Sequence, residues 1–227
     1  MNSSELPENT SSAKLLVGVA LAIWLALVFL LGANGSFVRA PGEAPIPILL
    51  GAIVPLVVFG VAYWGWRAFR ALVFAADLRL LTAIQAWRAG GLGFLALTVH
   101  GVLPGSFAWP AGLGDIAIGV TAPWVMLALI RRPAFVASRL FVVWNLLGIL
   151  DLVVAVSTGA LSSGVFGEAT GKVTTAPMAY LPLVLIPAYL VPLFVMLHIT
   201  ALVQSRRFSA SARSAEPVRQ EEPVEIG

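Results

Sequence analysis

The run from Leu80 to Pro123 constrains the fold of this chain most strongly. It reads LLTAIQAWRAGGLGFLALTVHGVLPGSFAWPAGLGDIAIGVTAP, in which two apolar segments of helix length flank a short, almost uncharged loop. A helix needs about 20 mostly apolar residues to cross a bilayer, and several other runs in the chain approach that length. The strongly polar residues within this run cost free energy wherever lipid replaces water, which makes them candidates for function. They are Gln85, Arg88, His100 and Asp115.

The composition also indicates an integral membrane protein. Hydrophobic residues make up 59% of the chain and charged residues 11%, with a mean hydropathy of +0.93, whereas a soluble domain carries roughly 25% charged residues. The net charge of +3 is small and the basic residues lie between apolar runs, so we expect the lipid bilayer and not a nucleic acid as partner. The chain has no cysteine, which excludes disulfides and thiolate chemistry.

The apolar runs predict an all-α, polytopic bundle of six transmembrane helices in one domain, residues 14–205. We expect a disordered polar lead over residues 1–13 and a disordered tail over residues 206–227. The expected helices cover about 14–31, 47–67, 80–102, 115–130, 140–158 and 179–204.

Three local features refine this outline. Asp77 is a plausible N-cap for the third helix. Small residues at four-residue spacing, Ala86 with Gly90 and Ala89 with Gly93, allow another helix to approach the third one closely. Residues 101–114 are expected to form an apolar loop at the interface, after which Asp115 begins the fourth helix.

Basic residues are distributed unevenly over the loops that join these helices. With the N-terminus in the cytoplasm, the outer face receives only Arg39 and Lys172. The cytoplasmic face receives Lys14, Arg67, Arg70, Arg79, Arg131, Arg132, Arg139, Arg206, Arg207, Arg213 and Arg219. Because cytoplasmic loops carry the excess of Lys and Arg, the sequence predicts that both termini are cytoplasmic.

Several short motifs occur in a fixed order from the third helix onward. They are Gln85-x-x-Arg88, Asp115-x-x-x-Gly119-x-Thr121-Ala122-Pro123, Trp144-Asn145, and a proline ladder of Pro182, Pro187 and Pro192 that ends in His198. Over roughly residues 80–205 the chain resembles a group of small bacterial multi-helix integral membrane proteins that have no assigned function. The resemblance implies a membrane-embedded helical fold in the bacterial cytoplasmic membrane, and it brings no activity with it.

Polar residues of the helices are expected to meet in the cytoplasmic half of the membrane. Asp151 lies about 16 Å into its helix and is too short to reach water by itself, so it must be protonated, paired or facing water. Arg88 lies about 12 Å from the cytoplasmic end. Its side chain could reach the cytoplasm by itself, and its guanidinium could equally reach Asp151. We therefore expect an Arg88–Asp151 pair within a polar cluster of Gln85, Arg88, Asn145, Asp151 and His198. A static structural pair explains Asp151 equally well.

The two histidines are expected at opposite membrane depths, about 20 Å apart. His198 lies in the cytoplasmic half, whereas His100 lies near the outer end of the third helix. They cannot share one haem or zinc ion, so no metal or other cofactor is predicted. Asp115 is expected to act as an N-cap, or else to form an outer-face site with His100.

Three functions remain open from the sequence. The first is non-enzymatic handling of a small-molecule ligand or a proton, by transport or sensing, through the polar cluster. The second is a membrane-embedded enzyme that acts on lipid at the outer face through His100 and Asp115. The third is a structural or accessory subunit whose polar residues only fix helix packing. A homodimer could supply the symmetry that many transporters have.

Overall fold

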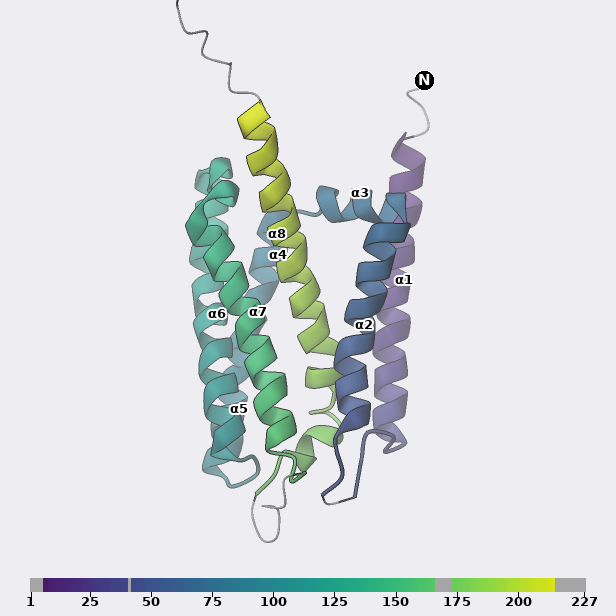
Figure 1. Ribbon diagram of the computed structural model, residues 1–227, viewed down its shortest axis with the longest axis vertical. Coiled ribbons are helices and arrows are strands. Elements are labelled where there is room, and N and C mark those ends of the chain that lie inside the picture. The colour runs from purple at the N-terminus through teal and green to yellow at the C-terminus, as the bar shows by residue number, and fades with distance from the viewer. Residues whose placement is uncertain (1–5, 41, 166–172, 215–227) are drawn as a thin grey trace, which may run out of the picture.

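Six helical spans that are long and apolar enough to cross a membrane form this molecule. A computed structural model describes residues 6–40, 42–165 and 173–214, and every regular element in these ranges is helical. The spans stand side by side as one bundle (Figure 1). Large apolar side chains point outward, such as Val61, which is 65% exposed, and Trp87, which is 82% exposed. Such a surface suits lipid and not water, and the expected all-α bundle of six spans is confirmed.

Four of the spans are continuous α-helices. They are α1 (Leu6–Ala33), α2 (Ile46–Gly65), α6 (Gly105–Arg131) and α7 (Arg139–Leu161). The third span is segmented into α4 (Leu78–Ile84), the 3-10 helix η1 (Gln85–Gly91) and α5 (Leu92–Val99). The last span begins with a π-helical turn, η4 (Ile186–Leu190), and continues as α8 (Val191–Ser214).

Both segmented spans turn their irregular backbone toward the protein interior. In η1, Gln85, Arg88 and Gly91 are buried, and Ala188 is buried in η4. Prolines at 187 and 192 lack the backbone donor that a regular α-helix needs, which explains the irregular start of the last span. Non-helical backbone is tolerated at membrane depth only where protein or a cavity surrounds it. The two interruptions therefore lie against the buried interior of the bundle.

A short helix, α3 (Arg67–Ala75), lies across one end of the bundle between α2 and α4 (Figure 1). Gln204 of α8 holds it in place, because its Nε2 donates to the carbonyl oxygens of Val73 and Ala76 at 2.7 and 2.9 Å. The expected cap of the third span is confirmed, since the backbone N–H of Arg79 donates to Asp77 Oδ1 at 2.8 Å. Smaller 3-10 turns, η2 (Pro133–Ala137) and η3 (Ala176–Ala179), occupy two of the other connections.

The structure differs from the expected boundaries at four places. The helix that contains Asp115 begins at Gly105, ten residues earlier, so the expected loop over 101–114 is mostly the first half of α6. Backbone groups in lipid favour continuous helical hydrogen bonding even through a Gly- and Pro-rich stretch. The last span starts later than expected, at Ile186. The lead and the tail are helical from Leu6 and as far as Ser214, and residues 1–5 and 215–227 lie outside the described residues.

The expected contact face of the third span is confirmed at Ala86 and Ala89, which pack against α6, and is wrong at the two glycines. A side chain at Gly90 or Gly93 would meet no atom within 4 Å, whereas a Cβ at Gly91 would lie 2.6 Å from Asp115 Cβ. The cause is η1, because a 3-10 helix has about 3.0 residues per turn and an α-helix about 3.6. Over seven residues this difference rotates the contact face away from the position that α-helical spacing predicts.

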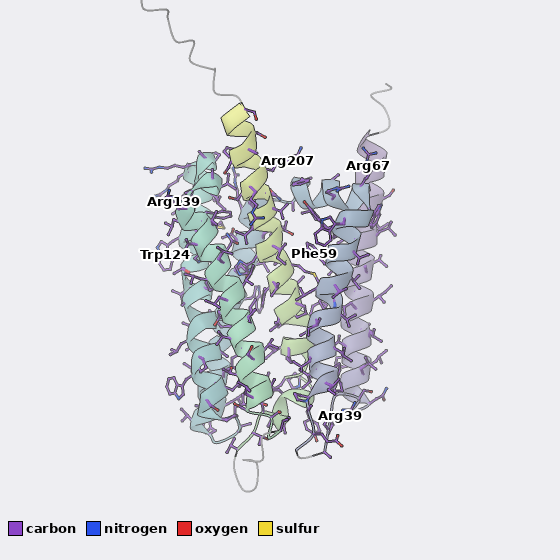
Figure 2. The ribbon with its side chains drawn as sticks, in the orientation of Figure 1. Arg39, Phe59, Arg67, Trp124, Arg139 and Arg207 are labelled. Carbon is purple, nitrogen blue, oxygen red and sulfur yellow. The ribbon has the colours of Figure 1, made fainter. Side chains whose placement is uncertain are left out.

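The start of α1 and the end of α8 lie at the same end of the bundle (Figure 1). Figure 2 shows Arg67, Arg139 and Arg207 at this end and Arg39 at the opposite end. The two ends of the folded molecule therefore differ in their basic residues, as the assignment of the loops to two opposite faces predicts.

Candidate functional site

The guanidinium of Arg88 is the centre of a buried polar cluster. Its side chain is 0% exposed, and it reaches from η1 to both α6 and α7. Nε donates to Asp115 Oδ1 on α6 at 2.7 Å, and Nη2 is paired with the carboxylate of Asp151 on α7. Nη1 donates to the carbonyl oxygen of Gly148 at 3.2 Å. One cation thus holds three spans together through two anions.

His198 of α8 closes the cluster on the side opposite the carboxylates. Its Nε2 lies 3.2 Å from Arg88 Nη1, and its Nδ1 lies 2.9 Å from Asn145 Oδ1. Asn145 Nδ2 donates to the carbonyl oxygen of Phe141 at 2.8 Å, which fixes Oδ1 as an acceptor. Nδ1 must therefore carry the ring proton, and Nε2 accepts from Arg88, which can only donate. This pattern assigns one tautomer to the imidazole.

Glycines on α6 and α7 make room for the charged side chains. A Cβ at Gly114 would collide with the Asp151 carboxylate, and a Cβ at Gly148 would collide with the His198 ring. At Gly119 it would collide with the backbone of Ala89 in η1. The helices therefore approach closely at the cluster, and the site is built into the packing of the bundle.

The structure brings together four of the five residues expected in the polar cluster: Arg88, Asn145, Asp151 and His198. The expected pair of Arg88 with Asp151 is present. Gln85 is buried nearby, but its Nε2 donates to the carbonyl oxygen of Phe194 at 3.4 Å, and its Oε1 has no partner among the described residues. That these residues form a functional site stays a prediction.

Asp115 belongs to this cluster and not to an outer-face site with His100. It is the eleventh residue of α6, so it does not cap that helix. Its neighbour across the helix pair is Gly91, and His100 follows nine residues later as the exposed C-cap of α5. At about 1.5 Å per residue, this separates Asp115 and His100 by more than 10 Å along the span. The expected His100–Asp115 pairing is therefore wrong, because Arg88 takes its place.

A cavity of about 300 Å³ leads to the cluster from the end of the bundle that carries Arg39. Its wall is mostly apolar and includes Phe37, Phe94, Phe107 and Met178, while Asp115 contributes a carboxylate to the lining. The side chains of Asp115 and Asp151 are 14% and 11% exposed, whereas that of Arg88 is 0% exposed. Asp115 thus reaches the cavity, whereas Arg88 is enclosed.

One comparison with known proteins identifies a family for the chain. A family model described as "Domain of unknown function (DUF8737)" matches residues 45–206, which is more than half of the sequence. The chain belongs to this family. The DUF8737 match includes every residue of the cluster and also α2, whereas the resemblance stated from motifs began only at about residue 80. No curated protein and no solved structure matches the chain. The family match is consistent with a group of proteins that have no assigned function, and the bacterial origin and the cytoplasmic membrane stay predictions.

The cluster in this chain contains more acid than base. Two carboxylates face one guanidinium, and the hydrogen-bond pattern leaves the imidazole uncharged. Among the described residues, no group of three or more His, Cys, Asp or Glu side chains could hold a metal ion. The absence of any cofactor stays a prediction. What the arrangement can do chemically is exchange one positive charge at its carboxylates.

Proposed function

We propose that this protein is a non-enzymatic membrane protein that handles a small molecule, and that its buried cluster takes up and releases a proton as it does so. The cluster consists of Arg88, Asp115, Asp151 and His198. The observation that carries the proposal is the excess of one carboxylate over guanidinium at the inner end of a cavity. In a low-dielectric interior an uncompensated charge is costly, so a proton or another cation must balance the second carboxylate.

The cavity allows the proton or cation that balances the second carboxylate to exchange with the solution on one side of the membrane. Asp115 lines the cavity, so water and ions that enter it can reach the carboxylate. Arg88 is sealed and keeps its charge at all accessible pH values. The mobile charge of the cluster is therefore located at its acids.

The interrupted spans support a transport-type site over an ordinary packing contact. Arg88 lies on the 3-10 stretch η1, and the π-turn η4 contributes Ile186 and Pro187 to the cavity wall. Transporters build their sites near the bilayer midplane from such discontinuous helices. A mid-span 3-10 or π segment frequently marks a functional position.

The proposal includes an orientation. The end that carries Arg67, Arg139 and Arg207 is proposed to face the cytoplasm, following the positive-inside rule. The cavity then opens on the outer face, on the side of Arg39.

A structural role is the second candidate, and one observation favours it. Arg88 has a partner at each of its three nitrogens, and glycine contacts fix the surrounding helices tightly. In that case the proton or cation that balances the second carboxylate would stay in place, and only the packing of the helices would depend on it.

Infrared spectroscopy of the protein in lipid nanodiscs separates the two candidates, because it resolves protonated carboxylic acids from carboxylates. We expect a carboxylic acid band that titrates with pH in the wild-type protein. Asp115→Asn and Asp151→Asn should each remove it, because either change leaves one carboxylate for one guanidinium. Both substitutions keep the shape of the side chain.

The matched control is Asp77→Asn, which changes an exposed acid and keeps a good N-cap. This variant should retain the band. A band that both cluster variants remove but that does not respond to pH would instead support the structural role. If no band distinguishes the wild type from the cluster variants, the proposed function is wrong.

A further inference from the structure

We infer that the cavity in front of Asp115 binds a small, mostly apolar molecule that carries one protonated amine, with the ammonium group at Asp115. This inference rests on the proposed function and names the ligand class of the same site. It follows from the shape of the cavity, from the second carboxylate oxygen of Asp115, which accepts no hydrogen bond from the described residues, and from the charge of the cluster.

The wall of the cavity selects an apolar molecular body. Aromatic and aliphatic side chains from distant parts of the chain line it, including Phe37, Phe94, Phe107, Leu152 and Val191. Its volume of about 300 Å³ lies at the small end of the range for small-molecule sites, which are typically apolar with a few placed polar groups. A compact ligand with one ring or a short branched chain suits these dimensions.

Asp115 supplies the placed polar group. The one hydrogen bond that the described residues make to its carboxylate comes from Arg88 Nε and ends on Oδ1. Its side chain is 14% exposed and lines the cavity. The second oxygen is therefore available to accept from a donor that enters from the cavity, in a geometry that the Arg88 contact holds fixed.

The charge of the cluster selects a cationic donor over a neutral one. Asp115 and Asp151 together need two positive charges, and Arg88 provides one. An ammonium group provides the second positive charge, in place of the proton that otherwise balances the second carboxylate. Binding then proceeds as R–NH₃⁺ plus the protonated carboxyl giving the ammonium–carboxylate pair plus H⁺, which balances atoms and charge. The ligand and the proton thus exclude each other at one site.

The test compares two probes of nearly equal shape, 2-phenylethylammonium and neutral 2-phenylethanol. Isothermal titration calorimetry on the protein in nanodiscs, with empty nanodiscs as blank, gives both affinities. We expect the ammonium to bind more tightly and to release a proton, which appears as a dependence of the heat on the ionisation enthalpy of the buffer. Asp115→Asn should weaken the ammonium roughly tenfold and leave the alcohol unchanged.

Two further variants locate the site. Asp77→Asn should bind both probes like the wild type, since Asp77 lies outside the cavity lining. Ala155→Leu should weaken both probes, because Ala155 lines the cavity and a larger side chain fills it. This second variant keeps the inference testable if Asp115→Asn does not give a monodisperse protein.

Equal affinities for the two probes, or an ammonium affinity that Asp115→Asn leaves unchanged, would overturn the inference. If the carboxylic acid band titrates as proposed but the ammonium does not bind, the ligand class is wrong and the proposed proton exchange stands. If the band is also missing, both are wrong.

Discussion

At the scale of single residues, the permanent charge of Arg88 determines what surrounds it. An arginine inside a bilayer cannot give up its proton, so each of its donors needs an acceptor. Asp115, Asp151, the Gly148 carbonyl and His198 provide these acceptors from three helices. Because two of the four are anions, the same arrangement that stabilises the guanidinium leaves an acid in excess. Under the proposed function, this excess acid is the group that exchanges a proton.

The tautomer of His198 is the first prediction. In protein labelled with ¹⁵N-histidine, NMR should show two imidazoles, because the chain has two histidines. We expect one ring fixed with its proton on Nδ1, as the contacts of His198 with Asn145 and Arg88 require. The signals of the other ring belong to His100, which is exposed. His198→Gln identifies the fixed ring, and a fixed ring with its proton on Nε2 would contradict the hydrogen-bond assignment.

At the scale of helices, the close approach of α6, α7 and α8 is what makes the cluster compact. Glycine at 114 and 148 lets the side chains of Asp151 and His198 lie directly against the neighbouring backbone. The segmented third span presents Arg88 to this interface, with Asp77 capping α4 and Gln204 binding the carbonyl groups of Val73 and Ala76 just before it. The geometry of the site is therefore a property of helix packing and not of a loop.

Glycine substitutions test this packing. Gly148→Ala should destabilise the protein by about 1–3 kcal/mol, because the new methyl group overlaps the His198 ring. Gly93→Ala is the matched control, since that position in α5 is open and alanine favours a helix by up to about 1 kcal/mol. The free energy of unfolding in an SDS titration gives both values. An equal effect of the two changes would show that the cluster is loosely packed.

The sequence predicts the spans better than it predicts their contacts. The length and hydropathy of the apolar runs suffice to predict six helices, because the bilayer sets both for a spanning helix. The depth of Asp151 suffices to predict its pairing with Arg88. The role of Asp115 was missed because a Gly- and Pro-rich stretch reads as a loop, although α6 passes through it. The close contact at Gly91, in place of Gly90 and Gly93, was missed because nothing in the spacing of the small residues reveals a 3-10 segment. The apolar cavity depends on side chains from distant segments and has no local signal.

At the scale of the whole molecule, the two ends of the bundle differ in charge. One end carries most of the basic residues together with the first helix start and the last helix end, and the cavity that Asp115 lines lies toward the other end. A cavity at one end is what a protein needs if its buried acids are to exchange protons with one side of the membrane. The homodimer expected from symmetry stays a prediction.

Reporter fusions test the orientation. A fusion after Ser214 should report a cytoplasmic location, and a fusion after Ser163, just beyond α7, should report the opposite side. Fusing at Ser205 is unsuitable, because that residue is buried and its Oγ donates to the carbonyl oxygen of Val136 at 2.6 Å. Two fusions on the same side would contradict the six-span topology, and the reversed pair would contradict the orientation.

Asp115 also changes the expected cost of single substitutions. With Asp151 as its only partner, Arg88 would be stranded by the loss of that acid. Because Asp115 remains, we expect Asp151→Asn to cost about 1–2 kcal/mol, and Arg88→Met, which leaves two buried carboxylates unpaired, about 3–5 kcal/mol. The free energies of unfolding of the two single variants check this order.

The most direct test of the shared arginine is a pair of double-mutant cycles on the free energy of unfolding in an SDS titration. One cycle combines Arg88→Met with Asp115→Asn, and the other combines Arg88→Met with Asp151→Asn. We predict a coupling energy of about 1 kcal/mol or more in both cycles, because both carboxylates contact the guanidinium. A coupling energy within error of zero in either cycle would contradict the cluster of one arginine between two acids.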